Sequence, residues 1–225
     1  MIDLRSWTSR PAPGQVAIEG ARIQLEPLDW DDHGSGLFAA VGGPANAALW
    51  TWMPVGPFPA RDDLGCFLLK MRTVENWRTM AIRDRVSGEI EGMASYMRIR
   101  EAHGSAEIGC VAFGPRLSRT AQATEALWLM ADHVFAALGY RRYEWKCNTA
   151  NAASMRAAAR FGFIFEGVFR NDMVMKGGNR DTAWFSITGE EWPALRAATA
   201  RWLAPANFGA DGEQVRTLES LRAPA

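Results

Sequence analysis

The sequence lacks an excess of charge of either sign, and it lacks long apolar runs. Its 225 residues include 25 Lys and Arg and 25 Asp and Glu, for a formal net charge of +0. Without a basic excess, no global field draws the chain to nucleic acid or to an anionic membrane, so an anionic ligand must be bound locally. No apolar run approaches the roughly 18 residues of a membrane-spanning helix, and the N-terminal stretch has no apolar segment of the signal-peptide type.

Cysteine and histidine are scarce, with three of each. No Cys-x-x-Cys pair or Cys/His cluster has zinc-site spacing, so we expect no metal. Of the three cysteines (Cys66, Cys110 and Cys147), the last two stand in apolar, strand-like runs, where a cysteine is usually a small buried hydrophobic residue. Because free thiols suit a reducing compartment, the sequence predicts a cytoplasmic protein.

What is present is the composition of a globular chain, with 48% hydrophobic and 22% charged residues. We expect an N-terminal arm at 1–20, one domain at 21–203 and a polar C-terminal tail at 204–225. The domain begins with antiparallel strands, continues as strand–helix–strand–helix and ends with a hairpin and a helix. The predicted strands are 21–28, 77–85, 89–100, 105–114, 141–149, 163–175 and 181–188, and the predicted helices are 29–41, 60–76, 120–138, 151–161 and 189–203.

The strand–helix–strand unit implies a parallel or splayed pair of strands within a mixed, mostly antiparallel sheet, so the fold class is α/β (α+β). The turn in this unit, "SRTAQATEAL" at 118–127, links a strand to a long helix. It is rich in small and hydroxyl residues and contains one arginine. A turn that presents free helix-start N–H groups beside a positive charge has the parts of an anion site.

This turn resembles the pyrophosphate loop of the GNAT acetyltransferase superfamily, which reads Q/R-x-x-G-x-G/A and often continues into "ATEAL". Here Ser118 replaces Gln/Arg and Ala121 replaces the first Gly. A second stretch, at 151–167, resembles the branch that contains the Rim-type ribosomal-protein N-terminal acetyltransferases. Its order of Asn-x-x-Ser, short helix, Gly-Phe and Glu-Gly matches Asn151, Ser154, Gly162–Phe163 and Glu166–Gly167. The resemblance covers roughly residues 21–192 and implies a GNAT fold, splayed at the cofactor site and flanked by helices.

The resemblance implies that acetyl-CoA is the cosubstrate. Its pyrophosphate would lie on the turn, with Arg119 as the charge clamp and Thr120 and Thr124 as hydroxyl donors. Its pantetheine arm would follow a strand bulge and meet Asn151. The full set of expected cofactor residues is Val111, Ala112, Phe113, Arg119, Thr120, Ala121, Gln122, Ala123, Thr124, Asn151, Ser154 and Arg160. Plainer interpretations remain open: Thr120 as a helix N-cap, Asn151 as an Asx turn, and Arg156 and Arg160 as a solvated face.

For catalysis, many superfamily members have a tyrosine as general acid on the short helix, and Ala158 stands at the matching position. Ser154 is therefore the expected donor to the leaving thiolate, or else only a helix cap. The general base is Glu107 or Asp172, although Glu107 could instead hold neighbouring strands together. Residues Trp50, Trp52 and Phe58, with Met53, form either a lid over the acceptor or a flap packed on the core.

These features predict an enzyme that moves the acetyl group of acetyl-CoA to a primary amine by direct attack in a ternary complex. The acceptor is a protein N-terminus or a small molecule; nucleic acid and membrane are not expected partners. The missing tyrosine keeps a non-catalytic acetyl-CoA sensor as the alternative. A dinucleotide-binding module is disfavoured because the sequence has no G-x-G-x-x-G. The sequence leaves a homodimer open.

Overall fold

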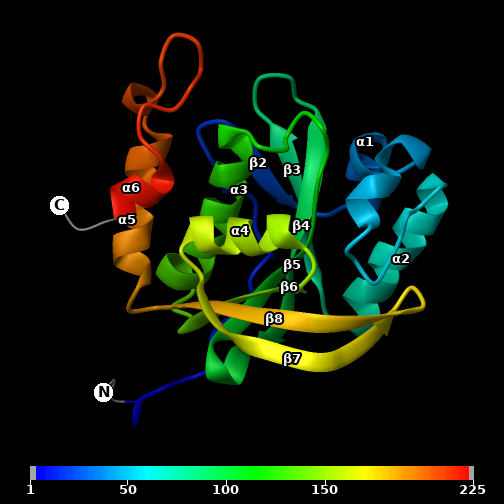
Figure 1. Ribbon diagram of the computed structural model, residues 1–225, viewed down its shortest axis with the longest axis horizontal. Coiled ribbons are helices and arrows are strands. Elements are labelled where there is room, and N and C mark those ends of the chain that lie inside the picture. The colour runs from blue at the N-terminus through cyan, green and yellow to red at the C-terminus, as the bar shows by residue number, and fades with distance from the viewer. Residues whose placement is uncertain (1–3, 223–225) are drawn as a thin grey trace.

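Eight strands form one mixed sheet in the computed structural model, which describes residues 4–222 (Figure 1). The order is β1-β2-β3-β4-β5-β6-β8-β7, with β5 and β6 parallel and every other neighbouring pair antiparallel. This confirms the predicted sheet. The strands are β1 (Ile18–Glu19), β2 (Ile23–Pro27), β3 (Arg78–Asp84), β4 (Ile90–Arg100), β5 (Ser105–Phe113), β6 (Arg142–Asn148), β7 (Ile164–Met175) and β8 (Gly178–Thr188).

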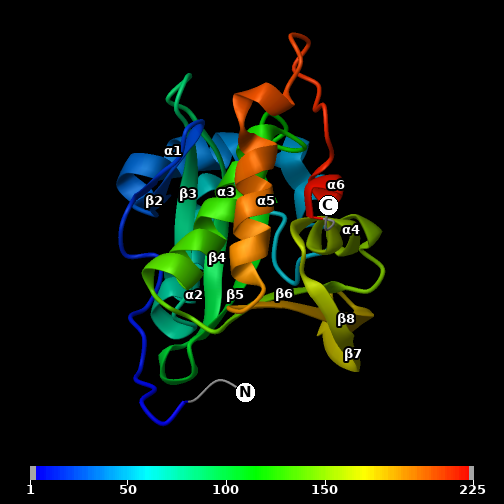
Figure 2. The same ribbon diagram turned by 90° about the vertical axis from the view of Figure 1, so that its left-hand side faces the viewer.

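Helices cover both faces of the sheet, α1 and α2 on one side and α3 and α5 on the other (Figures 1 and 2). Each side has its own hydrophobic core, the larger under α3 and the smaller under α1 and α2. The helices are α1 (Trp30–Val41), α2 (Arg61–Val74), α3 (Ala121–Asp132), α4 (Ala152–Phe161), α5 (Trp192–Leu203) and α6 (Leu218–Arg222), with 3-10 turns at Pro44–Trp50, Glu101–His103 and Pro205–Asn207. No helix in the described residues is long and apolar enough to cross a membrane.

The parallel pair separates after a short contact. β5 and β6 pair only over Ser105–Ile108 and Arg142–Trp145. Just beyond, β5 has a bulge in which Cys110 and Val111 oppose one residue of β4, and Cys110 has a φ of 45°. The resemblance placed this bulge at Val111, Ala112 and Phe113, but it begins one residue earlier, because the left-handed residue is Cys110. The bend turns β5 away from β6 and opens the sheet between them.

The residues of the second motif shape the path from α4 into β7. Gly162 ends α4 with a φ of 90°, a conformation that favours glycine. Phe163 is buried in the core below. The Glu166 carboxylate pairs with the Arg142 guanidinium at 2.6 Å and accepts a hydrogen bond from the Ser186 hydroxyl at 2.7 Å. The Gly-Phe and Glu-Gly parts of the motif are therefore structural, whereas its first part faces the site.

Helix α3 departs from its predicted face at one end. Helical spacing places Ala123, Leu127, Met130, Val134 and Ala137 on one apolar face. The first four are buried, but Ala137 is exposed. The last turn, His133–Ala137, is a π-helix. Its wider turn rotates later side chains away from the face that a 3.6-residue period predicts. The chain then reverses at Gly139, as expected, with a φ of 69°.

Within residues 4–222, the segments before β1 and after α5 pack on the domain more closely than the sequence suggested. The N-terminal arm crosses the turn between β4 and β5, where the Trp7 indole N–H donates to the Ala102 carbonyl at 2.8 Å. The segment after 203, predicted as a polar tail, folds back against α5 instead. Its sparse apolar residues Leu218 and Leu221 are buried beside Trp202. Two apolar residues in a polar run are a weak pattern, but three residues apart on one helix they cover one patch.

Candidate active site

The gap between β5 and β6 forms an open cavity of about 1270 Å³. It extends from the N-terminus of α3 to the β7–β8 hairpin and the loop after α1. Most of the predicted site residues line it, namely Glu107, Val111, Phe113, Arg119, Thr120, Ala121, Gln122, Ala123, Thr124, Asn151, Ser154, Arg160, Asp172 and Trp52. Ala112, Trp50 and Phe58 do not line it, because all three are buried in the core under α1 and α2.

At one end of the cavity, the start of α3 presents backbone donors. The Thr120 hydroxyl caps the helix: it accepts from the Ala123 N–H at 3.1 Å and donates to the Leu117 carbonyl at 2.6 Å. The Thr124 hydroxyl likewise lies 3.4 Å from the Thr120 carbonyl. The hydroxyls predicted as ligand donors thus serve the backbone. The donors that remain are the first-turn N–H groups of Ala121 and Gln122, which precede any intrahelical bond.

Arg119 occupies the sharp point of this turn, with a φ of 64°. Ala121 is in the helix with negative φ, the condition under which it can replace the family's glycine. A second cation, Arg160 on α4, donates to the Thr124 hydroxyl at 3.2 Å and stacks 4.9 Å from the Trp202 ring. Burial lowers the pKa of the Arg160 guanidinium, a cost that an anion beside it would offset. Arg156 is exposed and lies outside the cavity lining.

Helix α4 turns Ser154 into the cavity wall. Asn151 caps this helix, its side-chain oxygen accepting from the Ser154 N–H at 3.1 Å. The Ser154 hydroxyl oxygen accepts from the Trp145 indole N–H at 3.0 Å. Ser154 is therefore not the capping side chain. Since an indole can only donate, the hydroxyl hydrogen is left for another acceptor.

The residue at the family's tyrosine position lies outside the cavity lining. Ala158 is fully buried in the core. Its neighbour Ala157 is the residue that lines the wall. Neither position offers a hydroxyl, which leaves Ser154 as the hydroxyl of α4 that faces the cavity.

The two candidate bases differ in environment. Glu107 is buried, with its carboxylate 2.5 Å from the Lys146 ammonium and 3.8 Å from the Arg98 guanidinium. Burial raises the pKa of Glu107, and Lys146 and Arg98 offset part of that rise. A carboxylate with a raised pKa in a cavity is suited to accept a proton near neutral pH. Asp172 lies exposed on β7 at the cavity rim.

The loop between α1 and α2 divides into a core part and an accessible part. The Trp50 indole is fully buried, donates to the Val41 carbonyl at 2.8 Å, and packs 4.7 Å from the Phe58 ring. Trp52 is 41% exposed and lines the cavity. The Lys176 ammonium at the hairpin tip donates to the Trp50 carbonyl at 2.6 Å, so loop and hairpin meet. Of the predicted lid, only Trp52 has the exposure that a lid requires.

Several cavity residues were not predicted. They are Arg98, Lys146, Arg180 and Trp184 near the hairpin, and Arg22, Trp202, Phe208 and Gln214 near α3. The β8 residues had a readable signal, because Arg180, Thr182 and Trp184 alternate along one strand and share a face. The C-terminal residues had none, since their segment was taken as a tail. Among the described residues, no group of three or more His, Cys, Asp and Glu is placed to hold a metal ion.

Known proteins resemble this chain over nearly its whole length. A crystal structure of a GCN5-related N-acetyltransferase from Brucella melitensis is 46% identical, with a TM-score of 0.93 over 97% of this chain and 99% of that one. A probable GNAT-family acetyltransferase from Chromobacterium violaceum ATCC 12472 is 39% identical, with a TM-score of 0.79 over 86% of this chain and 96% of that one.

A curated relative, the "Uncharacterized N-acetyltransferase YoaA" of Bacillus subtilis (strain 168), is 33% identical over 106 residues. The match spans 47% of this chain and 59% of that protein. Residues 22–164 match the family described as "Acetyltransferase (GNAT) domain". Family match, identity and fold agree with the loop motif at the start of α3: the chain belongs to the GNAT acetyltransferase family.

Proposed function

We propose that the protein transfers the acetyl group of acetyl-CoA to a primary amine by direct attack in a ternary complex. The observation that carries this proposal is the cavity itself. One end has free helix-start N–H groups and arginines suited to phosphates, and the other has a buried carboxylate, Glu107. A hydroxyl that can donate, that of Ser154, lines the wall as well.

The cofactor residues divide by the part of acetyl-CoA that they suit. Arg119 and the N–H groups of Ala121 and Gln122 would hold the pyrophosphate, with the helix dipole adding to the attraction. The strand edge around Val111 would pair with the amides of the pantetheine arm. Asn151, whose oxygen is used in the cap, has its side-chain N–H groups left to donate. The C-terminal segment that lines this end belongs to the same functional unit as residues 21–203.

In the reaction, Glu107 takes a proton from the ammonium. The free amine then attacks the thioester carbonyl, the new C–N bond forms, and the C–S bond breaks. The electron pair leaves on the CoA sulfur, where the Ser154 hydroxyl donates a hydrogen bond to the thiolate, and the proton lost by the attacking nitrogen protonates that sulfur to give free CoA. Asp172, at the rim, is the second candidate for the base.

Two cysteines line the same cavity, and their state favours direct attack over an acetyl-cysteine intermediate. Burial raises the pKa of the Cys110 thiol to about 12. Burial also raises the pKa of Cys147, although a hydrogen bond with Ser154 offsets part of the rise. A cysteine is nucleophilic as the thiolate, which is scarce at neutral pH when the pKa is raised.

The two motifs favour the branch that contains the Rim-type ribosomal-protein N-terminal acetyltransferases, and the three free cysteines favour a reducing, cytoplasmic setting. The test is release of CoA from acetyl-CoA in the presence of peptides, polyamines, aminoglycosides and amino acids, with acetyl-CoA binding measured by calorimetry. We expect turnover with at least one amine class. Binding of acetyl-CoA without turnover of any amine would reject the proposal and favour a sensor.

A further inference from the structure

The end of the cavity away from α3 has a surplus of positive charge. A row of contacting side chains crosses β4, β5, β6 and β8. Lys146 lies 3.9 Å from the Trp184 ring and Arg98 5.3 Å from it, and both cations also contact Glu107. Along β5, the run from Glu107 to Phe113 spans roughly 20 Å at about 3.3 Å per residue. Phosphates bound at the start of α3 would therefore be too far away to contact this row of side chains, which remains available to bind the acceptor.

Three cations (Arg98, Lys146 and Arg180) and two carboxylates (Glu107 and Asp172) line this end of the cavity. Lys146 is compensated, because its ammonium lies 2.5 Å from the Glu107 carboxylate and 3.2 Å from the Glu144 carboxylate, so the surplus charge is that of the two arginines. Asp172 forms no ion pair within 4.0 Å in the described part of the chain, so Arg98 and Arg180 are not neutralised by it. Arg98 is 52% exposed and only 3.8 Å from Glu107 at its closest approach.

Arg180 is a cation of this end that is held in place and still has unused donors. It shares one face of β8 with Thr182 and Trp184, and all three line the cavity. Its Nε atom donates to the Thr182 hydroxyl at 3.0 Å, which fixes the guanidinium. Within residues 4–222 its two Nη groups have no hydrogen bond or ion pair, and the Trp184 indole N–H is also without a partner. A fixed guanidinium with two free N–H groups suits a carboxylate.

The rest of this end is apolar and aromatic. The side chains that complete it are Leu49, Trp52, Met53, Trp77, Met97 and Met173. An acidic pocket, which a polyamine would need, is absent from this lining. A small acceptor that satisfies both the cations and the aromatic walls has a carboxylate and a large apolar group.

We propose that the acceptor is a free amino acid with an aromatic or large apolar side chain, whose carboxylate binds Arg180 and whose amine is presented to Glu107. This rests on the proposed acetyl transfer. The site would select acceptors that have a carboxylate, because an amine without one leaves the Arg180 guanidinium unpaired in a partly enclosed site. A peptide N-terminus, which has no carboxylate at that position, would lack the same contact.

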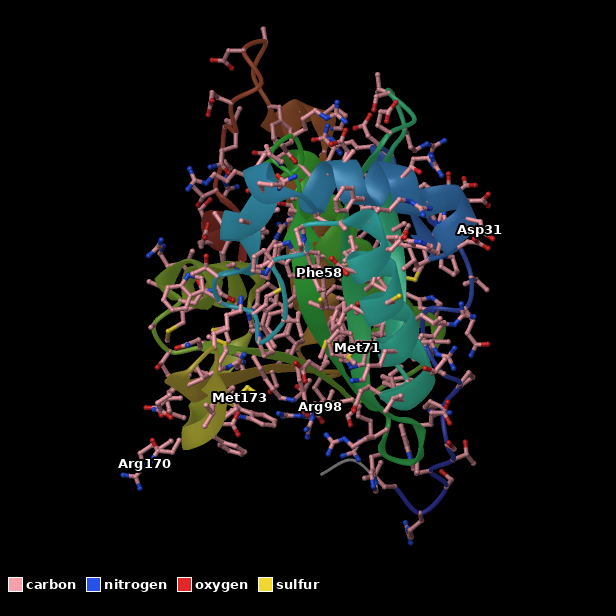
Figure 3. All side chains as sticks on the ribbon, turned by 90° about the vertical axis from the view of Figure 1, so that its right-hand side faces the viewer. Asp31, Phe58, Met71, Arg98, Arg170 and Met173 are labelled. Atoms are coloured by element: carbon pink, nitrogen blue, oxygen red, sulfur yellow. The ribbon has the colours of Figure 1, made fainter. Side chains whose placement is uncertain are left out.

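The test compares matched acceptors in the CoA-release assay: phenylalanine, phenethylamine, which lacks the carboxylate, and phenylalaninamide, which has an amide in its place. We expect kcat/KM for phenylalanine to exceed the other two about 10- to 100-fold, the range for one charge-assisted contact. In Arg180→Gln the ratio should fall towards one. Arg170→Gln is the matched control. Arg170 lies on the neighbouring strand outside the cavity lining and projects away from the molecule, whereas Met173 and Arg98 line the cavity (Figure 3).

Equal turnover of phenethylamine and phenylalanine, or loss of the preference in Arg170→Gln as well, would overturn this inference while leaving the acetyl transfer intact. Preference for phenylalaninamide or a peptide would also overturn it and would indicate that the acceptor is a protein N-terminus. A binding measurement keeps the two proposals separable: N-acetylphenylalanine should bind at least 10-fold more tightly than N-acetylphenethylamine, and Arg180→Gln should remove the difference. This result does not require turnover.

Discussion

The two ends of the cavity are built in different ways. At the α3 end, the donors are mostly backbone N–H groups of one continuous stretch, 118–124, fixed by a helix start. At the hairpin end, the groups are side chains from four strands and a loop, and ion pairs and ring contacts position them. The first end can be identified from a local motif, whereas the second exists only once distant strands pair. The predictions below test that contrast.

The largest effect should come from Glu107→Gln. If Glu107 is the base, this change should lower kcat by about 100- to 10,000-fold, the usual range for general base catalysis. Burial raises the pKa of Glu107, so the wild-type rate should rise with pH as this group loses its proton, above the normal range of a glutamate. In a pH–rate profile, the Glu107→Gln variant should lack this rising limb.

Asp172→Asn is the comparison for this experiment, since it removes the exposed carboxylate and leaves the buried one. We expect it to retain the pH limb. If Asp172→Asn loses the limb and Glu107→Gln keeps it, the base lies on the hairpin and Glu107 only ties the strands through Lys146.

Ser154→Ala should lower kcat by about 10- to 1,000-fold with little change in acetyl-CoA affinity, because it removes a donor used when the thiolate forms. The structure sharpens this test, since Asn151 rather than Ser154 is the helix cap, so the loss of stability should be limited to the unpaired Trp145 indole N–H, about 1–3 kcal/mol. Trp145→Phe is the companion variant: it removes the N–H that holds the Ser154 hydroxyl but keeps the hydroxyl. A Ser154→Ala protein with wild-type kcat would end the catalytic assignment.

The same contrast explains which parts of the fold and of the site could be predicted from the sequence. Periodicity and turn residues identified every strand except β1, which lies in the predicted arm, together with the mostly antiparallel sheet and its parallel or splayed pair, because these depend on local pattern. Ser154 and Glu107 were placed in the cavity by motif and strand position. The lid was wrong for Trp50 and Phe58, since a proline-rich aromatic loop looks alike whether it packs inward or outward. Packing on α1 and the Val41 carbonyl decided that outcome.

Arg180 and the C-terminal segment show the other limit. Arg180 is one of many arginines in the sequence, and its role appears only when β8 pairs with β6 beside the gap. Phe208 and Gln214 reach the cavity because α6 is held by Leu218 and Leu221 on α5, a contact no local period predicts. Sites assembled from long-range contacts are therefore the ones that need the structure.

Arg119→Glu should weaken acetyl-CoA binding by about 10- to 100-fold or more, since one charge-assisted contact is lost and repulsion is added. Arg119→Gly separates charge from backbone. Glycine accepts the φ of 64° without strain, so this variant keeps the turn and loses only the side chain. We expect it to fall between wild type and Arg119→Glu in calorimetry. Equal affinity in all three would mean that the N–H groups act alone.

The smallest effects should separate the two halves of the loop after α1. Trp50→Phe removes a buried N–H donor to the Val41 carbonyl, so the free energy of unfolding should fall by about 1–3 kcal/mol. Its acceptor preference should not change, because Trp50 lies outside the cavity lining.

Trp52→Ala should do the opposite. Trp52 is 41% exposed, and a substitution at such a site usually changes stability by less than about 0.5 kcal/mol. Since Trp52 lines the acceptor end, its loss should raise KM for an aromatic amine several-fold. Urea unfolding and KM on both variants give a two-by-two comparison. If Trp50→Phe changed KM and left stability intact, the buried ring would be part of the acceptor site after all, and the division of this loop into core and lid would be wrong.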